Sequence, residues 1–288
     1  MPAFWMLVSC LLFAFMGVCV KLGSDTFSTG EIVFYRGAVS MLMMFVLART
    51  QGITLRTPHW RMHVSRSLSG TFALSCYFFA IGVLPLATAV TLNYTSPIFV
   101  ALLLALVFRE KLRWPGVLSI VLGFAGVVLL LRPTLTADQW LGAIAGLSSG
   151  AVASIAYISV RELGRVGEPE VRTVFWFSLV TTVFGLGMSL HAGPRQPDVQ
   201  ELVILLGVGV FGGLAQLAMT RSYRYGRTLV SANLSYATVV FASLFGALLW
   251  DEIMPWVSWI GVACIVISAI MISLRPPRKA PPVSEIAD

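Results

Sequence analysis

The distribution of apolar residues divides the chain into ten long hydrophobic segments separated by short polar stretches. A helix needs about 20 apolar residues to cross the roughly 30 Å hydrocarbon core of a bilayer. Each segment comes close to this length and is apolar on all sides, as expected for a membrane-spanning helix. We therefore predict transmembrane helices at residues 3–21, 31–48, 66–84, 87–108, 114–131, 139–160, 172–190, 201–219, 229–250 and 256–274.

Two of these segments, with the residues that follow them, repeat one another. Residues 92–114 align without a gap on residues 234–256, and six positions are identical: Leu92/Leu234, Tyr94/Tyr236, Phe99/Phe241, Ala105/Ala247, Glu110/Glu252 and Trp114/Trp256. A repeat at about half the chain length indicates a duplicated unit. In a membrane protein such a repeat is typical of a transporter.

The composition excludes a soluble globular domain. Of the 288 residues, 57% are hydrophobic and only 11% are charged, whereas a soluble domain carries roughly 25% charged residues. The four cysteines all fall inside apolar segments, so we expect reduced thiols and no disulfide framework. No cleavable signal peptide is expected, because no basic residues precede the first apolar segment.

The net charge of +7 is explained by membrane orientation and not by nucleic-acid binding. Lys and Arg accumulate on the cytoplasmic side of membrane proteins. If the N-terminus is cytoplasmic, sixteen of the 20 cations, Arg66 among them, lie on that side and three on the other, while Arg36 lies inside a predicted span. Five spans per unit then place the second unit inverted relative to the first. We predict units at residues 1–135 and 136–275, cytoplasmic termini, and a disordered cytoplasmic tail at 276–288.

Several motifs resemble those of EamA-type transporters of the drug/metabolite transporter superfamily. They are Phe34-Tyr35-Arg36 in the second segment, the run Asn93–Pro97 in the fourth, Gly123–Gly126, and Arg132-Pro133. The second unit departs from the pattern, since Val239 stands at the counterpart of Pro97 and Trp176 near that of Arg36. The resemblance covers about residues 3–275 and implies a polytopic carrier of small organic solutes, often an exporter of amino acids or related metabolites.

Arg36 is the first candidate for the site, because ionisable residues inside a membrane usually face a cavity or a partner. One reading is a structural or gating ion pair with Asp251 or Glu252. The other is direct contact with an anionic substrate. Arg36 lies about 7 Å from the outer end of its segment, so its side chain is also able to reach the membrane surface.

The remaining candidates are polar or aromatic residues within apolar segments. The polar run at 93–96 precedes a proline, which removes a backbone donor and favours a kink beside a cavity. Such residues serve equally in helix–helix hydrogen bonding or as interface anchors. The predicted cavity-lining residues are Arg36, Tyr77, Asn93, Tyr94, Ser96, Pro97, Tyr157, Trp176, Gln216, Tyr223, Asn233 and Tyr236.

Enzymatic readings have little support. Gly146-Leu147-Ser148-Ser149-Gly150 matches G-x-S-x-G, but that motif requires a strand–turn–helix elbow and a nearby base. Gly142, Gly146 and Gly150 form a small-residue stripe, which favours packing within the protein over dimerisation. The sequence lacks a P-loop, H-E-x-x-H and C-x-x-C, so we expect no cofactor or metal.

We therefore predict a secondary transporter in the inner (plasma) membrane that moves small organic metabolites by alternating access, with amino-acid-like solutes exported. The alternatives are import of a metabolite, vitamin or nucleotide-like cofactor and, remotely, an intramembrane hydrolase. The acidic residues lie in loops or at segment ends, which favours a facilitator or exchanger. The expected partners are a small-molecule substrate and lipid, without nucleic acid, and the protein is expected to be a monomer or homodimer.

Overall fold

The computed structural model describes residues 2–84, 86–107, 114–131, 139–193, 195–250 and 256–273, and every regular element within them is a helix. The helices are α1 (Pro2–Ser24), α2 (Thr29–Thr50), α3 (Trp60–Val83), α4 (Leu86–Asn93), α5 (Ser96–Leu106), α6 (Trp114–Leu131), α7 (Trp140–Arg165), α8 (Glu170–Ala192), α9 (Val199–Tyr225), α10 (Thr228–Leu234), α11 (Ala237–Trp250) and α12 (Trp256–Ser273). The prediction of an all-α protein is confirmed for these residues.

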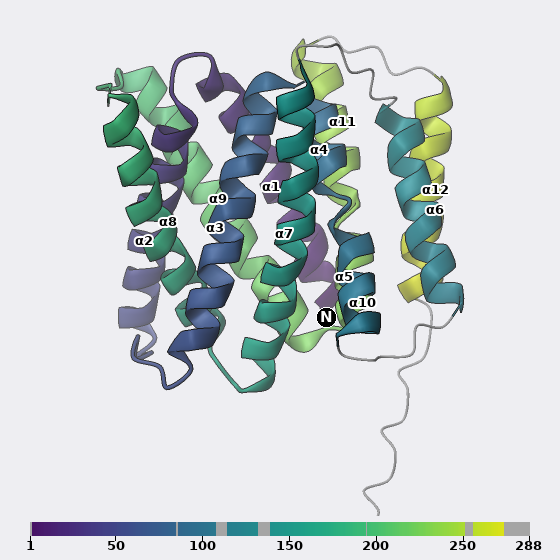
Figure 1. The fold of residues 1–288 in the computed structure, drawn as a ribbon, viewed down its shortest axis with the longest axis horizontal. Coiled ribbons are helices and arrows are strands. Elements are labelled where there is room, and N and C mark those ends of the chain that lie inside the picture. Colours follow the sequence, from purple (N-terminus) through teal and green to yellow (C-terminus); the bar gives the residue numbers. More distant parts are fainter. Residues whose placement is uncertain are drawn as a thin grey trace, which may run out of the picture.

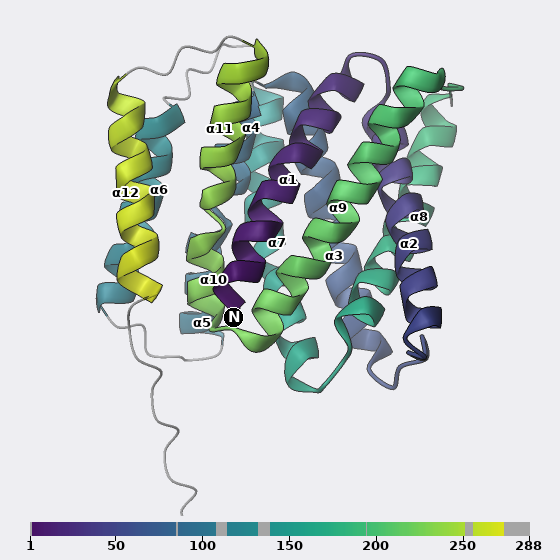
Figure 2. The ribbon, with the colours of Figure 1, turned by 180° about the vertical axis from the view of Figure 1, so that it is seen from behind.

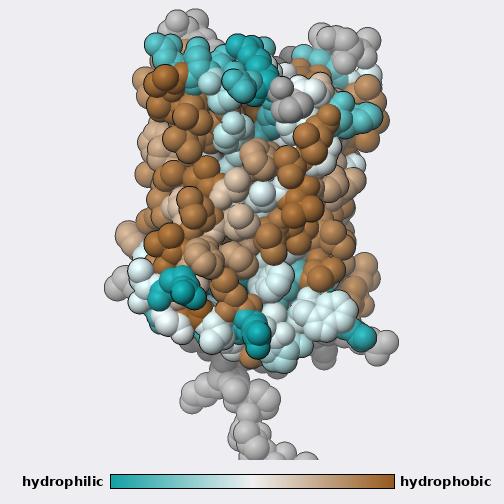
Figure 3. All heavy atoms as spheres, turned by 90° about the vertical axis from the view of Figure 1, so that its left-hand side faces the viewer, coloured by the Kyte–Doolittle hydropathy of each residue, from teal (hydrophilic) through white to brown (hydrophobic). Residues whose placement is uncertain are grey.

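The long helices suit a membrane. Within the described ranges, six stretches are long and apolar enough to span one: Pro2–Ser24, Thr29–Thr50, Trp140–Arg165, Glu170–Ala192, Val199–Tyr225 and Thr228–Leu249, the last running through α10 and α11. Figure 3 shows, on the face of the bundle at the left of Figure 1, a hydrophobic band across the middle between two more polar ends. The chain is therefore a multi-pass membrane protein.

The helices run side by side in an elongated bundle (Figures 1 and 2). The α2/α8 pair forms one end of the long axis and the α6/α12 pair the other, while α3, α7 and the α4/α5 pair lie on one broad face and α1, α9 and the α10/α11 pair on the opposite one. The most extensive packing is between α2 and α8, followed by α1 with α9 and α3 with α7. We call the end of the bundle where α1 begins, at the bottom in Figure 1, the amino end.

Local sequence explains where two of the helices begin. Ser28 caps α2 and Asp198 caps α9, and in each case the glutamate three residues later, Glu31 or Glu201, bonds back to the backbone N–H of the cap. This reciprocal capping box satisfies backbone donors that have no partner inside the helix. Lys21 caps the C-terminal end of α3, because its ammonium donates to the carbonyls of Ile81 and Leu84 there.

Glycines allow the closest helix contacts. A Cβ atom at Gly37 would lie 2.6 Å from the backbone nitrogen of Thr182, and one at Gly185 would lie 2.4 Å from that of Phe34, so α2 and α8 approach to backbone contact. The glycine stripe on α7 has the same role. Gly142 meets Leu84, Gly146 meets Leu92, and Gly150 meets the last carbonyls of α4 and the hydroxyl of Thr95, so the stripe packs within the protein.

One prediction of helix position was wrong in a way that affects the site. The sequence predicts a transmembrane segment at residues 66–84, with Arg66 at the edge of the polar loop that precedes it. In the structure α3 begins six residues earlier, at Trp60, and Arg66 is 2% exposed. Arg66 is thus a buried cation and not part of the polar surface at the amino end.

Candidate substrate cavity

Both copies of the internal repeat break at the same place. The predicted segment 87–108 is divided into α4 and α5 at Tyr94-Thr95, and the segment 229–250 into α10 and α11 at Ser235-Tyr236. Pro97 is present in the first copy only, with Val239 at its counterpart in the second, so proline alone does not account for the breaks.

Hydroxyl side chains take over part of the backbone hydrogen bonding at these breaks. Thr95 Oγ1 donates to the carbonyl of Leu92 at 2.8 Å, and Ser235 Oγ donates to that of Ala232 at 2.6 Å. Both bonds run to the carbonyl three positions earlier, although the counterpart of Thr95 in the repeat is Ala237 and not Ser235. An irregular backbone at membrane depth is tolerated only where such groups are satisfied or shielded from lipid.

A cavity with an empty volume of about 560 Å³ lies beside the first break. Its wall combines polar, aromatic and apolar side chains from α1, α3, α4, α7, α8 and α9. They are Phe13, Met16, Arg66, Gly70, Ala73, Leu74, Tyr77, Asn93, Tyr94, Ala153, Ala156, Tyr157, Phe177, Gln216 and Met219.

The spacing on α3 explains how this helix forms one wall. Arg66, Gly70, Ala73 and Tyr77 follow one another at intervals of four, three and four residues, which places them on one helix face. The two small residues leave room between the guanidinium at one end of this face and the phenol ring at the other. The face therefore offers a charge and an aromatic surface to the same cavity.

Arg66 and Arg36 lie against the same aromatic ring. The guanidinium carbon of Arg36 is 4.6 Å, and that of Arg66 4.1 Å, from the centroid of the Phe177 ring on α8. Arg36, which is fully buried, therefore points into the protein and not toward the outer surface that its position in the sequence allowed.

These two cations have few polar partners. Arg36 Nη2 donates to Gln216 Oε1 at a long 3.4 Å, while Nε and Nη1 of both arginines are buried without a hydrogen-bond partner. A cation–π contact contributes about 0.5–2 kcal/mol, whereas burying an unpaired ion costs several kcal/mol. Both guanidinium carbons lie within 5 Å of the same ring centroid, so the two like charges also repel one another. The Phe177 contacts therefore do not compensate for the burial of both charges.

A smaller cavity adjoins the first and shares Phe13, Tyr94, Tyr157 and Met219 with it. Tyr223 and Tyr157 stack there with ring centroids 5.5 Å apart. Ser235, from the second helix break, lines this cavity too. The two breaks are thereby connected through one aromatic region.

The structure brings together about half of the residues that the sequence predicted. Tyr77, Asn93, Tyr94, Tyr157 and Gln216 line the main cavity, Tyr223 lines the adjoining one, and Arg36 lies behind Gln216. Asn93 also donates to Ser149 Oγ at 2.9 Å, which fixes its amide against α7.

The other predicted residues lie elsewhere. Ser96 and Pro97 are buried at the start of α5 and do not border the two cavities described. Asn233 donates to Ser119 Oγ and to the carbonyl of Ser268, so it joins α10 to α6 and α12. Tyr236 is fully buried against Gly123 of α6. The predicted gating residues Asp251 and Glu252 lie outside the described residues.

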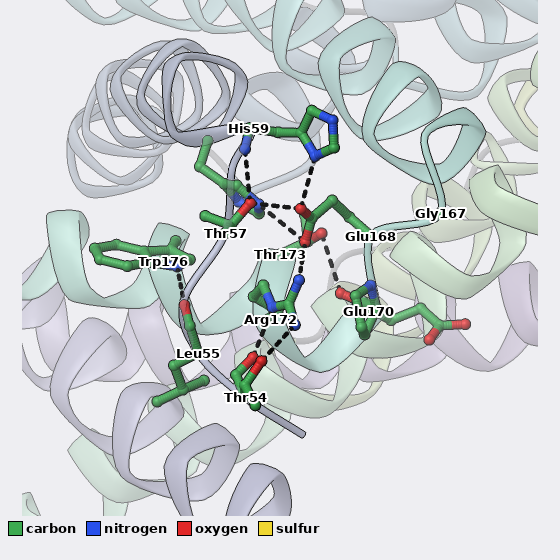
Figure 4. A network of polar contacts seen from close by, with 12 residues as sticks. Thr54, Leu55, Thr57, His59, Gly167, Glu168, Glu170, Arg172, Thr173 and Trp176 are labelled. Carbon is green, nitrogen blue, oxygen red and sulfur yellow. Dashed lines mark hydrogen bonds and ion pairs between the residues drawn. The ribbon is translucent and has the colours of Figure 1, made fainter. Parts of the chain in front are cut away.

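Trp176 belongs to a network at the amino end (Figure 4). Its indole N–H donates to the carbonyl of Leu55 at 3.0 Å, in the loop between α2 and α3. Its ring borders an apolar pocket with Trp60, His63, Val64, Ser67 and Val180, and this pocket shares no lining residue with the main cavity.

The centre of this network is Glu168, in the loop between α7 and α8. Its carboxylate accepts hydrogen bonds from Thr57 and from Arg172 Nη1 at 2.8 Å, and it lies 3.0 Å from His59 Nδ1 and 3.4 Å from His63 Nε2. Burial raises the pKa of Glu168, but the hydrogen bonds from Thr57, His59 and Arg172 outweigh it and lower that pKa to about 2. Arg172 also donates to Thr54, so the network ties the α2–α3 loop to α8. We call Thr54, Thr57, His59, His63, Glu168 and Arg172 the Glu168 network.

Sequence reasoning missed Arg66 and Phe177. Arg66 lies at the edge of its apolar segment, where cations are common, and Phe177 is one of 18 phenylalanines. A signal for Arg66 was present, because Gly70, Ala73 and Tyr77 continue its helix face into the segment. The serine motif at 146–150 lies in the middle of α7, where Ser149 donates to the Gly146 carbonyl, and no strand–turn–helix elbow is formed there.

Comparison with known proteins agrees with this arrangement. The chain is 29% identical over 261 residues to the pseudopaline exporter of Pseudomonas aeruginosa, covering 91% of this chain and 92% of that protein. It is 25% identical over 288 residues to a riboflavin transporter of Vibrio cholerae, covering 96% and 94%. A solved crystal structure with 21% identity superposes with a TM-score of 0.81 over 95% of this chain and 96% of the other, which supports the fold.

The sequence pattern of the EamA-like transporter family matches residues 1–132 and again residues 140–274. Together these matches cover nearly the whole chain, and the related proteins are transporters and not enzymes. The chain belongs to the EamA-like transporter family.

Proposed function

We propose that this protein is a secondary transporter that moves small organic metabolites through the main cavity by alternating access. The observation that carries the proposal is the cavity itself. It is lined by buried polar and aromatic side chains and lies beside a helix break that has a counterpart in the other half of the chain. Substrate sites of secondary transporters typically lie near the midplane, between repeats and beside discontinuous helices.

We further propose ten spans, with α4/α5 and α10/α11 each forming one, arranged as two inverted five-helix units at residues 1–135 and 136–275. The paired contacts support this. The close approaches of Gly37 to Thr182 and of Gly185 to Phe34 are interchanged by a shift of 148 positions, as a two-fold relation requires. The packing of α1 on α9 likewise has its counterpart in that of α7 on α3. The excess of Lys and Arg on the side of the amino end favours cytoplasmic termini.

Export of amino-acid-like solutes across the inner membrane is the first proposal for direction and substrate, and the relative named as an exporter supports it. Import of a vitamin or nucleotide-like cofactor is the second, and the relative named as a riboflavin transporter favours a cavity for aromatic solutes. Tyr77, Tyr94 and Tyr157 offer such solutes flat stacking surfaces.

The transport cycle is proposed to need no proton relay in the cavity. The described residues that line it include no carboxylate and no histidine. Facilitated diffusion or exchange requires only that the cavity face each side of the membrane in turn. Uptake by proteoliposomes that responds to a pH gradient at clamped membrane potential would contradict this.

Solute counterflow tests the proposal directly. The purified protein is reconstituted into liposomes, loaded in turn with pools of amino acids, purines, vitamins and organic acids, and assayed for uptake of the matching labelled solute. We expect counterflow for at least one pool, and its loss in Tyr157→Ala. Phe72→Ala, on an exposed apolar side chain, is the matched control and should transport normally. Absence of counterflow for every pool, with folded protein in the vesicles, would refute a secondary transporter.

A further inference from the structure

The two arginines against Phe177 differ from the other cations that the structure describes as buried or partly buried. Arg172 has a carboxylate oxygen of Glu168 at 2.8 Å, Arg224 has one of Glu170 at 3.0 Å, and Lys21 has two carbonyls. Arg36 and Arg66 are more deeply buried than Arg172 and Arg224, yet no carboxylate of the described residues lies within 4 Å of either. A buried cation without a counterion is unfavourable unless something else supplies the negative charge.

Small residues make room for both guanidiniums. A Cβ atom at Gly70 would lie 2.1 Å from Arg66 Nη1 and 2.9 Å from the Phe177 ring, and one at Gly212 would lie 3.3 Å from Arg36 Nε. Arg66 therefore occupies space left by a glycine on its own helix, and Arg36 occupies space left by a glycine on α9. The charges are held in place rather than directed to the membrane surface.

The cavity wall offers free donors next to these charges. Arg66 and Gln216 both line the cavity, and Arg66 Nε and Nη1 and Gln216 Nε2 are buried without a hydrogen-bond partner. Arg36 lies behind Gln216 and holds its amide oxygen, which leaves the amide N–H₂ as the donor group. A guanidinium fork and one additional donor match the two oxygens of a carboxylate.

We propose that the cavity is an anion site, and that the substrate is a small organic acid whose carboxylate binds Arg66 and Gln216 while Arg36 adds charge from behind. This inference rests on the proposed transport function and specifies its substrate class. The remaining wall, with Tyr77, Tyr94, Tyr157 and Met219, accommodates an aromatic or branched apolar body. An ammonium group finds no carboxylate among the described lining residues, so the acid group of an amino-acid-like solute is the part that is recognised.

Pairs of acids and amides of the same shape provide the test. The probes are phenylacetate, indole-3-acetate and 4-methylpentanoate, each with its carboxamide, measured by thermal shift of the purified protein and by inhibition of counterflow. At least one acid is expected to bind ten-fold or more tightly than its amide. Equal binding of acid and amide in all three pairs would overturn the proposal.

Variants of Arg66 test whether this residue recognises the carboxylate. In Arg66→Gln the preference for the acid should disappear. In Arg66→Lys, which keeps the charge but not the fork, it should persist in reduced form, which separates a charge effect from misfolding. Arg61→Gln is the matched control, because it removes an exposed cation from the same helix. An unchanged acid preference in folded Arg66→Gln would contradict the site.

The outcomes separate this inference from the function on which it rests. Counterflow of an uncharged solute at equal rates in the wild type and in Arg66→Gln would support the proposed transport function and exclude the anion site. A probe acid that binds only to wild-type and Arg66→Lys protein, without any counterflow, would support the anion site and reject secondary transport.

Discussion

Ser119 and Ser268 exchange hydrogen bonds across the contact between α6 and α12. Ser119 Oγ donates to the backbone carbonyl of Ser268 at 2.7 Å, and Ser268 Oγ donates to that of Ser119 at 2.6 Å. On the same two helices Gly126 packs against Gly261. A shift of 142 positions, the one that aligns the two sequence repeats, converts one of these pairs into the other. The relation between the halves thus extends from sequence to tertiary contacts.

Removing one member of the serine pair should destabilise the protein. In Ser119→Ala, the Asn233 amide loses its 2.6 Å acceptor in addition to the bond between the serines. An unsatisfied buried polar group costs about 1–3 kcal/mol, so we expect a lower melting temperature in detergent. Ser159→Ala, on an exposed hydroxyl, is the control and should change little. Equal melting temperatures for both variants would show that the pair does not hold α6 to α12.

Gly70→Ala should impair ligand binding with little effect on the fold elsewhere. The added methyl group overlaps the position of Arg66 Nη1, so the guanidinium must move away from Phe177. We expect about a ten-fold loss of affinity for any carboxylate ligand, measured by thermal shift or counterflow inhibition. Gly187→Ala has open space around the new Cβ and should bind normally. Undiminished binding by Gly70→Ala would mean that the position of the Arg66 guanidinium does not depend on the missing side chain at Gly70.

Two aromatic residues that the sequence predicts to line the cavity should differ in their effect on transport. Tyr157 lines both cavities, whereas Trp176 is bonded to the α2–α3 loop and borders neither. Tyr157→Ala should therefore raise KM for counterflow by ten-fold or more. Trp176→Phe, which loses the bond to Leu55, should lower thermal stability by roughly 1 kcal/mol and leave KM unchanged. The reverse pattern would place the substrate at the amino end.

Glu168→Gln should lower stability at neutral pH in a pH-dependent way. A carboxyl whose pKa is lowered on folding stabilises the protein above the pKa it has when unfolded, and loses this contribution as pH falls through its folded value. The shift of the Glu168 pKa to about 2 corresponds to about 3 kcal/mol. The difference in melting temperature between wild type and variant should shrink as pH falls below about 4.5, where the carboxyl of the unfolded chain becomes protonated.

Glu162→Gln is the comparison for that experiment. Glu162 forms an exposed pair with Arg165 at 3.4 Å, and such pairs contribute about 0–1 kcal/mol. Its melting temperature should stay near that of the wild type throughout. A Glu168→Gln difference that does not shrink below about pH 4.5 would contradict the assignment of Glu168 as an ionised acceptor.

The sequence by itself determined the architecture. Apolar runs of about 20 residues leave no stable alternative to helices in lipid, because every backbone group must be satisfied inside the segment. The repeat at 92–114 and 234–256 coincides with the two helices that break, but the sequence predicted a kink only beside Pro97 in the first copy. The polar run around Tyr94 lies at the first break and borders the cavity. Tyr77, Tyr157 and Gln216 could be selected because aromatic and amide groups inside apolar segments require a partner or a cavity.

Only the tertiary structure decided which polar residues face the cavity and which hold helices together. Asn93 and Asn233 look alike in sequence, yet one borders the cavity and the other is engaged by Ser119 and Ser268. Arg66 resembles a surface cation, and its burial depends on Phe177, more than a hundred residues away, and on the absence of a side chain at Gly70. Side-chain orientation in a bundle is set by the neighbouring helices, and local sequence does not encode which helices those are.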